Sequence, residues 1–406
     1  MYTRSNYLRQ IEPFLRKPVV KVLTGMRRSG KSCLMRLLME KLAAEGVARG
    51  RIVYIDKESY AFDAIRTYHD LVAHVTAARP KGHGMCHVFV DEIQEIEGWE
   101  RAVADWSGRR DLDVVISGSN AHLLSGELAT LLAGRFVELR VFPLSFMEFA
   151  DFHGLQGADA ADVFARFLQY GGLPGLHEFG RLDDATFRPF AAGVYDTILL
   201  RDIVQRHQIR NHALLEQVVR FVFDNIGNLT NASRINAFLK NQKTSVGVDT
   251  ILNYLRWLAD AHLTHRVLVY DIRGHRHLEV NEKQYVGDLG LRSVLLGYRA
   301  QDISGMLENV VCLELLRRGC QVSVGRIGDR EIDFVAERDG RKTYVQVAYL
   351  LPTRATLERE VAPLLAVADN YPKLLLTLDR AMGDDYQGVQ RRYLPDWLAG
   401  KPDAAR

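Results

Sequence analysis

The fold class is decided by residues 19–42, which read VVKVLTGMRRSGKSCLMRLLMEKL. A β-branched run opens this stretch, a Gly-rich turn follows, and apolar residues at helical spacing close it. The turn runs from Gly25 to Ser32 and fits the pattern G-x-x-x-x-G-K-S. Between a strand and a helix, this pattern predicts a phosphate-binding P-loop and therefore an α/β fold.

Each part of this turn suits a nucleoside triphosphate. The glycines let backbone N–H groups approach phosphate oxygens, and the following helix directs its positive N-terminal end at the same oxygens. The Lys31 ammonium is expected to reach the β- and γ-phosphates, and the Ser32 hydroxyl to ligate Mg²⁺. The turn therefore predicts ATP and Mg²⁺ as ligands. The expected nucleotide-binding residues are Gly25, Arg28, Ser29, Gly30, Lys31, Ser32 and Cys33.

An acidic pair further along the chain supplies the second half of such a site. In CHVFVDEIQEIEGWE, a buried type of strand over residues 88–90 leads into Asp91 and Glu92. An Asp at the carboxyl end of a strand beside the P-loop strand is placed to hold Mg²⁺, directly or through water. Glu92 is then placed as the general base for the attacking water. A surface acid pair is the plainer interpretation, but the P-loop upstream favours the functional one.

Polar residues around the next two strands extend the expected site. LDVVISGSN ends in Ser119 and Asn120, either of which could sense the γ-phosphate, although turn formation explains them equally well. Arg135 follows Gly134 ahead of another strand. An Arg that stabilises charge on the γ-phosphate, in cis or from a neighbouring subunit, raises the rate strongly. We expect Arg135 to act catalytically with Lys31, although ion pairing with nearby acids explains it as well.

Four stretches of the chain carry a resemblance to a known family. They read GMRRSGKS, VFVDEIQ, ISGSNAHLLSGELATLLAGRFVELRVFPLSFMEF and YGGLPG. In them the chain resembles the AAA-type P-loop ATPases that carry a C-terminal domain of unknown function, of the AAA_14 and DUF4143 type. The resemblance covers nearly the whole chain. It implies an additional-strand, AAA-like ATPase core and a nuclease-like C-terminal domain, and it implies no particular biological role.

The middle of the chain is predicted to be helical and then winged. Residues 151–205 show a helical pattern that YGGLPG, at residues 170–175, interrupts. Residues 206–290 suggest a winged helix, because three helical patterns precede a hairpin around Gly274. DNA contact and packing against protein both stay open, because two acids lie on the outward face of the third helix. That face holds Asp249, Thr250, Asn253, Arg256, Trp257 and Asp260.

Residues 291–406 are expected to form a restriction-endonuclease-like domain. The order is helix, strand, strand, strand, with Glu308 on the helix and Asp333 and Gln346 on a hairpin. Many metal-dependent nucleases carry Glu-x-Lys on the second hairpin strand, but Gln346 and Ala348 stand at those positions here. A neutral amide thus replaces a carboxylate, and a methyl group replaces the ammonium beside the attacking water. We therefore predict that the domain does not cut nucleic acid by the two-metal route.

The composition fits a globular protein and excludes several classes. The chain has 406 residues, of which 47% are apolar and 25% charged, and its formal net charge of +3 is too small to indicate nucleic acid. Four Cys without a CxxC motif indicate neither a disulfide framework nor a zinc site, which suits a reducing cytosol. No apolar run is long enough to span a membrane, and the N-terminus lacks the apolar stretch of a signal peptide.

These observations predict a cytoplasmic, Mg²⁺-dependent ATPase with four parts. They are an ATPase core at residues 1–150, a helical lid at 151–205, a winged-helix domain at 206–290 and a nuclease-like domain at 291–406. Nucleotide state is expected to control how the winged-helix and nuclease-like domains contact a partner. An ATP-regulated DNA nuclease and a slow-turnover signalling switch with protein partners are the alternatives, and a homo-oligomer is an open expectation.

Overall fold

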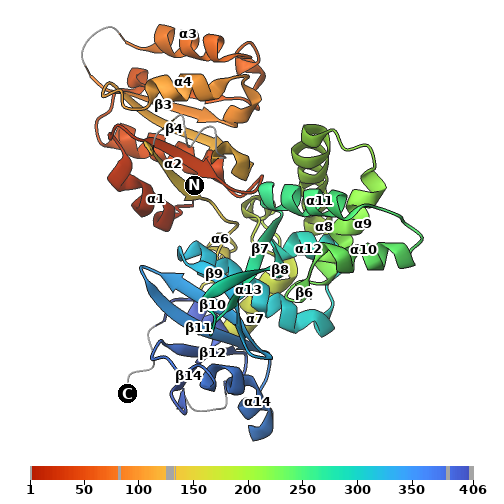
Figure 1. Ribbon diagram of the computed structural model, residues 1–406. Coiled ribbons are helices and arrows are strands. Elements are labelled where there is room, and N and C mark those ends of the chain that lie inside the picture. Colours follow the sequence, from red (N-terminus) through yellow and green to blue (C-terminus); the bar gives the residue numbers. More distant parts are fainter. Residues whose placement is uncertain (1, 81–83, 125–131, 133, 381–384, 402–406) are drawn as a thin grey trace. The chain divides into compact units, whose positions relative to one another are not determined.

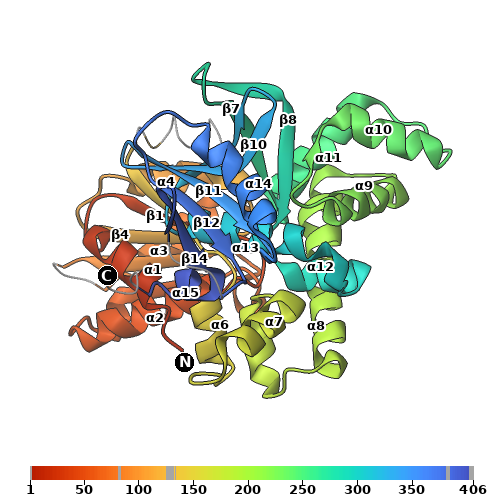
Figure 2. The ribbon, with the colours of Figure 1, turned by 90° about the horizontal axis from the view of Figure 1, so that it is seen from below.

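A computed structural model describes residues 2–80, 84–124, 132, 134–380 and 385–401 (Figures 1 and 2). The chain forms two compact units. The first comprises Met1–Pro143 with Asp260–His262, and the second comprises Leu144–Ala259 with Leu263–Arg406. Within the described ranges, no helix combines the length and the apolar character needed to cross a membrane.

The first unit is built on a parallel five-stranded sheet in the order β2-β3-β4-β1-β5. Its strands are β1 Val20–Thr24, β2 Ile52–Asp56, β3 Cys86–Asp91, β4 Leu112–Gly118 and β5 Phe136–Arg140. The longest of its described helices are α1 Ser5–Ile11, α2 Lys31–Ala44, α3 Tyr68–Ala78 and α4 Trp99–Trp106. The predicted α/β class is thus confirmed for this unit.

Both faces of this sheet are covered, which explains why every residue of its central strands β1, β3 and β4 is buried. Successive strand residues point to opposite faces. On β4, Val114 packs in the cluster that includes residues of α3 and α4, whereas Val115 packs in the cluster that includes residues of α1 and α2. The two pairs of helices therefore lie on opposite sides of the sheet, as Figure 1 shows. The carboxyl ends of the parallel strands share one edge, where the P-loop follows β1.

The second unit combines helices with a nine-stranded mixed sheet in the order β13-β14-β12-β11-β10-β9-β7-β8-β6. Its main helices are α6 Phe146–Phe152, α7 Ala160–Tyr170, α8 Asp184–Thr197, α9 His212–Asp224, α10 Ala232–Asn241, α11 Val248–Asp260, α12 Leu289–Leu296, α13 Ile303–Arg317, α14 Arg354–Leu365 and α15 Leu394–Leu398. Its strands are β6 Leu229–Thr230, β7 Thr264–Asp271, β8 Arg276–Val286, β9 Gln321–Ile327, β10 Arg330–Arg338, β11 Arg341–Ala348, β12 Lys373–Thr377, β13 Asp385–Tyr386 and β14 Val389–Tyr393.

The hairpin expected as a wing belongs to this large sheet. Strand β7 pairs with β8 in antiparallel fashion and with β9 in parallel fashion, and Val269 lies opposite Val324 (Figures 1 and 2). The boundary predicted between residues 290 and 291 therefore does not separate two compact units. The lid, the winged helix and the nuclease-like domain remain predictions about parts of one unit.

The YGGLPG motif has a packing role in the second unit. The Gly172 N–H donates to Asp288 Oδ2 at 2.6 Å, and Asp288 also caps the N-terminus of α12. Gly171 has a φ of +71°, and a Cβ there would lie 2.2 Å from Asp288 Oδ1. A Cβ at Gly172 would lie 2.6 Å from the Leu144 carbonyl oxygen. Both positions therefore require glycine, because backbone and a buried carboxylate approach them closely.

Candidate functional site

The loop between β1 and α2 is shaped to receive an anion. Gly25 has a φ of +145°, and a Cβ there would lie 2.2 Å from the Val141 carbonyl oxygen. Gly30 has a φ of +99° immediately before α2. The first N–H groups of a helix have no partner within it. The Ser29 hydroxyl is buried and, within the described part of the chain, has no hydrogen-bond partner. The loop therefore offers unused donors, as phosphate binding requires.

Lys31 is held within this loop. Its ammonium donates to the carbonyl oxygens of Gly25 at 2.9 Å and Met26 at 3.2 Å. It also lies 3.6 Å from Glu92 Oε1, and the Lys31 side chain is only 3% exposed. The structure thus brings the predicted phosphate-binding lysine and the predicted general base into direct contact.

Glu92 is buried directly after β3 in the left-handed conformation, with a φ of +51°. Burial opposes ionisation, but the positive charges of Lys31 and Arg27 outweigh it and lower the pKa of Glu92. The Gln94 amide donates a hydrogen bond to Glu92 Oε2. Glu92 is therefore ionised and oriented at neutral pH, as a general base must be.

Asp91 lies at the carboxyl end of β3 and is 2% exposed. The Ser117 hydroxyl donates to Asp91 Oδ1, and the Tyr54 hydroxyl donates to Oδ2 at 3.3 Å. Burial raises the pKa of Asp91, whereas hydrogen bonds from Ser117 and Ser32 oppose that rise. The predicted metal ligands Ser32 and Asp91 thus contact each other, and a divalent cation beside them would favour the ionised carboxylate.

Asn120 and Ser119 follow β4 at the same edge of the sheet, and both are buried. The Ser119 side chain lies near the Glu92 carboxylate, but its hydroxyl makes no hydrogen bond within the described part of the chain. The assignment of a γ-phosphate sensor to Asn120 remains a prediction.

Arg135 is not brought to this site. It precedes β5, its carbonyl oxygen accepts from the Val20 N–H at 2.9 Å, and its side chain is exposed. Its guanidinium lies near Gly108, where an added Cβ would be 2.8 Å from Arg135 Nη1. Val20 begins β1, whereas the P-loop follows the other end of that strand. A catalytic role in cis does not fit the position of Arg135 at the end of the sheet away from the P-loop. Its role in trans remains a prediction.

Three arginines in or near the loop were not predicted as site residues from the sequence. Arg140 ends β5 opposite Thr24, the last strand residue before the loop. The Arg4 guanidinium is 3% exposed and donates to the Ser29 carbonyl oxygen at 2.9 Å. Arg27 pairs with Glu58 and lies near Glu92. No local motif marks Arg4 and Arg140, because strand register and a chain crossing bring them here, whereas Arg27 lies within the loop itself.

Mixing two inactive variants tests the role of Arg135 in trans. If a neighbouring subunit supplies the arginine, Arg135→Ala should hydrolyse ATP about 10³-fold or more slowly. An equimolar mixture with Glu92→Gln should then recover activity, because one mixed interface retains both groups. Phosphate release is measured on mixtures shown by cross-linking to contain both chains. No recovery in such mixed assemblies would leave Arg135 a structural role, and Arg110→Ala is the matched control.

Comparisons with known proteins agree with the ATPase architecture. Residues 17–150 match the family model of an AAA domain, AAA_14. Residues 161–302 match a domain of unknown function, DUF8612, rather than the expected DUF4143 type. The Walker-type ATPase PABY2304 of Pyrococcus abyssi has a similar fold, with a TM-score of 0.53 and 16% identity, over 73% of this chain and 96% of that chain. Residues 17–150 are thus similar to an AAA domain, and the chain shares its fold with a Walker-type ATPase.

Two relatives resemble nearly the whole chain. An uncharacterized protein of Haemophilus influenzae is 36% identical over 400 residues, which cover 98% of each chain. The uncharacterized protein MJ1544 of Methanocaldococcus jannaschii is 27% identical over 373 residues, which cover 87% of this chain and 79% of that one. The chain belongs to the same family as the H. influenzae protein.

Proposed function

We propose that the protein binds ATP with Mg²⁺ at the edge of the five-stranded sheet and hydrolyses the bond between its β- and γ-phosphates. The observation that carries this proposal is the convergence of Lys31, Glu92 and the Ser32–Asp91 pair around the loop. These groups come from one strand end and one helix start, and they supply the separate parts that phosphoryl transfer to water needs.

Each residue has a distinct task in this proposal. Backbone N–H groups of the loop and the Lys31 ammonium would hold the phosphates. Ser32 and Asp91 would hold Mg²⁺, which supplies positive charge against the phosphate oxygens. Glu92 would accept a proton from the attacking water, and the Gln94 amide helps to keep its carboxylate in place. Asn120 would sense the γ-phosphate.

The test is phosphate release from ATP by the purified chain. We expect slow release in the range of about 1 s⁻¹ or less without a partner, since the structure does not bring Arg135 to the edge that holds Lys31 and Glu92. Release should stop when EDTA removes Mg²⁺. A chain that binds no ATP in the presence of Mg²⁺ would contradict the proposal.

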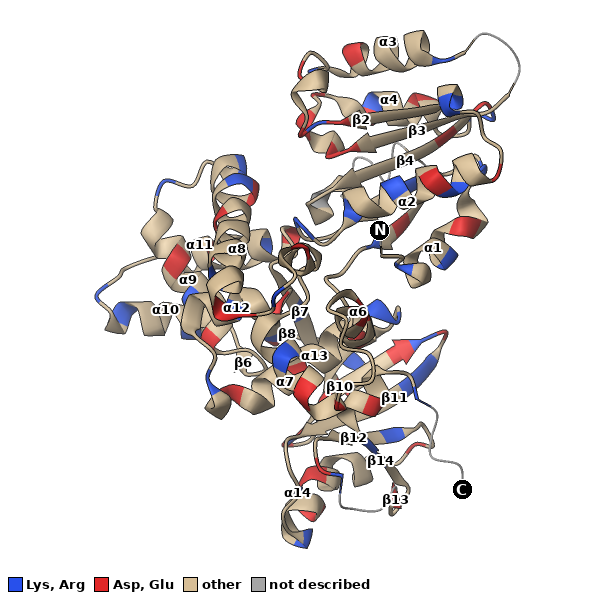
Figure 3. Ribbon diagram, turned by 180° about the vertical axis from the view of Figure 1, so that it is seen from behind, with Lys and Arg blue, Asp and Glu red and all other residues tan. Residues whose placement is uncertain are grey.

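We further propose that nucleotide state controls how the second unit meets a partner. Helix α11 was the candidate for reading DNA, but its Trp257 ring stacks on His207 at 4.3 Å between centroids. Val248 and Leu252 on the same helix are exposed, and so is the acid Asp249. Basic and acidic residues are interspersed over α8 to α11 rather than separated by sign (Figure 3). These features support a protein partner, and salt-sensitive retention on DNA would speak for nucleic acid instead.

A further inference from the structure

A lysine is buried among three carboxylates in the second unit. Lys283 lies on β8, and its side chain is 2% exposed. Its ammonium nitrogen lies 3.0 Å from Glu308 Oε2, 2.7 Å from Glu331 Oε1 and 3.4 Å from Asp333 Oδ1. Glu308 comes from α13, and the other two acids come from β10. If this part of the chain is nuclease-like, as predicted, Asp333 is its expected metal ligand and Glu308 a candidate for the second.

We propose that the Lys283 ammonium occupies the position of a divalent cation, so that the chain supplies its own cation and closes this site to metal. A lysine ammonium has three donor hydrogens. Three carboxylates surround it within ion-pair distance, one for each donor. The proposal concerns a second site, so it stands or falls independently of ATP hydrolysis in the first unit.

Hydrogen bonds from outside the cluster hold two of its acids in place. Asp333 Oδ2 accepts from the Val347 N–H at 2.9 Å, and the Tyr285 hydroxyl donates to Glu308 Oε2 at 2.9 Å. Gln346 Oε1 faces the Asp333 N–H at 3.4 Å, so its oxygen is turned toward the backbone. Consistently, over the described ranges no group of three or more His, Cys, Asp or Glu is arranged to hold a metal ion.

The charges favour a permanent cation at this place. Burial opposes a charged lysine, but Asp333, Glu308 and Glu331 outweigh it and hold the pKa of Lys283 above its usual range. Burial and the neighbouring Asp333 raise the pKa of Glu308, and Lys283 opposes that rise. Removing the ammonium would leave buried carboxylates without compensating charge unless a proton or another cation enters.

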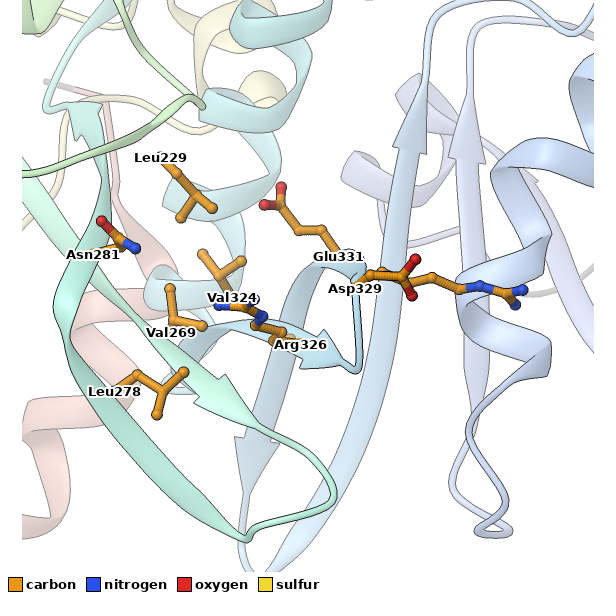
Figure 4. A pocket seen from close by; sticks show the side chains of 10 residues that line it. Leu229, Val269, Leu278, Asn281, Val324, Arg326, Asp329 and Glu331 are labelled. Atoms are coloured by element: carbon orange, nitrogen blue, oxygen red, sulfur yellow. The ribbon is translucent and has the colours of Figure 1, made fainter.

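One acid of the cluster lines a cavity. Glu331 is 38% exposed on its side chain and lines a cavity of about 360 Å³ (Figure 4). Leu229, Val269, Leu278 and Val324 form the apolar part of this cavity, and Asn281 and Arg326 are among its polar residues. The cluster therefore meets solvent at Glu331, whereas Asp333 and Lys283 lie buried behind it.

The experiment measures Mn²⁺ binding by electron paramagnetic resonance in chains without nucleotide. Every chain carries Ser32→Ala, which removes the hydroxyl that is expected to ligate metal at the ATPase site. Lys283→Ala should bind one Mn²⁺ roughly 100-fold more tightly than the parent, because affinity follows the charge of the ligand set. Adding Asp333→Ala should abolish that binding. Lys342→Ala is the matched control, because this lysine of the same sheet donates to the Tyr270 hydroxyl instead.

Two results would overturn the proposal. One is a folded Lys283→Ala chain that binds Mn²⁺ no better than the parent. The other is Mn²⁺ binding by the parent that Asp333→Ala removes, together with metal-dependent cleavage of supercoiled DNA. Lys283 would then be the nuclease lysine that the hairpin lacks at Ala348. If Lys283→Ala does not fold alone, its refolding yield with Mn²⁺ decides: recovery supports the proposal, and no recovery contradicts it.

Discussion

Glu92→Gln is expected to bind ATP as the wild type does and to hydrolyse it about 10²- to 10⁴-fold more slowly. Glutamine keeps the shape of the side chain but cannot accept the proton of the attacking water. The structure supports this role, because the positive charges of Lys31 and Arg27 keep the Glu92 carboxylate ionised despite its burial. The loss should therefore appear in the chemical step and not in ATP affinity.

Single-turnover phosphate release and equilibrium ATP binding, measured on the same preparation, separate these two effects. Glu97→Gln is the matched control, since it changes an exposed acid a few residues away on the same segment. Wild-type turnover in Glu92→Gln would show that another group activates the water. A parallel fall in affinity would instead mean that the carboxylate mainly holds Lys31, which lies 3.6 Å away.

Lys31→Ala is expected to lose ATP affinity by about 2–5 kcal/mol, or roughly 30- to several-thousand-fold. The lysine is buried and fixed by the carbonyl oxygens of Gly25 and Met26, so its charge is preorganised at the loop. Without it the phosphates would meet the Glu92 carboxylate with less opposing charge. Binding of a fluorescent ATP analogue at fixed Mg²⁺ measures the loss.

Lys41→Ala provides the control for Lys31→Ala. It removes a lysine from the same helix, but this lysine pairs with Glu12 and Glu45 on the surface. Its affinity for ATP should equal that of the wild type. Equal affinities for Lys31→Ala and the wild type would show that the loop backbone alone carries the phosphates, and the assignment of Lys31 would be wrong.

The ATPase core was predictable because its evidence is local. Gly25 to Ser32 form one turn, and Asp91 and Glu92 follow one strand, so a parallel sheet brings both to the same edge. Arg135 illustrates the limit. It lies only a few residues before Arg140, but a strand separates them, and the structure places only Arg140 opposite Thr24 at the edge of the loop.

The lysine of the second unit could not have been predicted from the hairpin. Lys283 is separated in sequence from Asp333 by two α-helices and a strand. The two residues meet because their strands belong to one sheet, in which β10, β9, β7 and β8 follow one another in this order. The only local signal is the polar run Glu282, Lys283 and Gln284 inside a strand, where apolar alternation is expected. All three of these side chains are buried.

The pairing of β7 with β9 limits which segments of this chain can be exchanged between genes. A gene shortened after residue 290 would encode β7 as a bare edge, whose main-chain groups are free to recruit a strand from another molecule. A gene fusion that supplied only residues 291–406 would expose the opposite edge, on β9, in the same way. Recombination can therefore exchange the second unit as a whole, whereas its terminal part must evolve in place beside the strands that complete it.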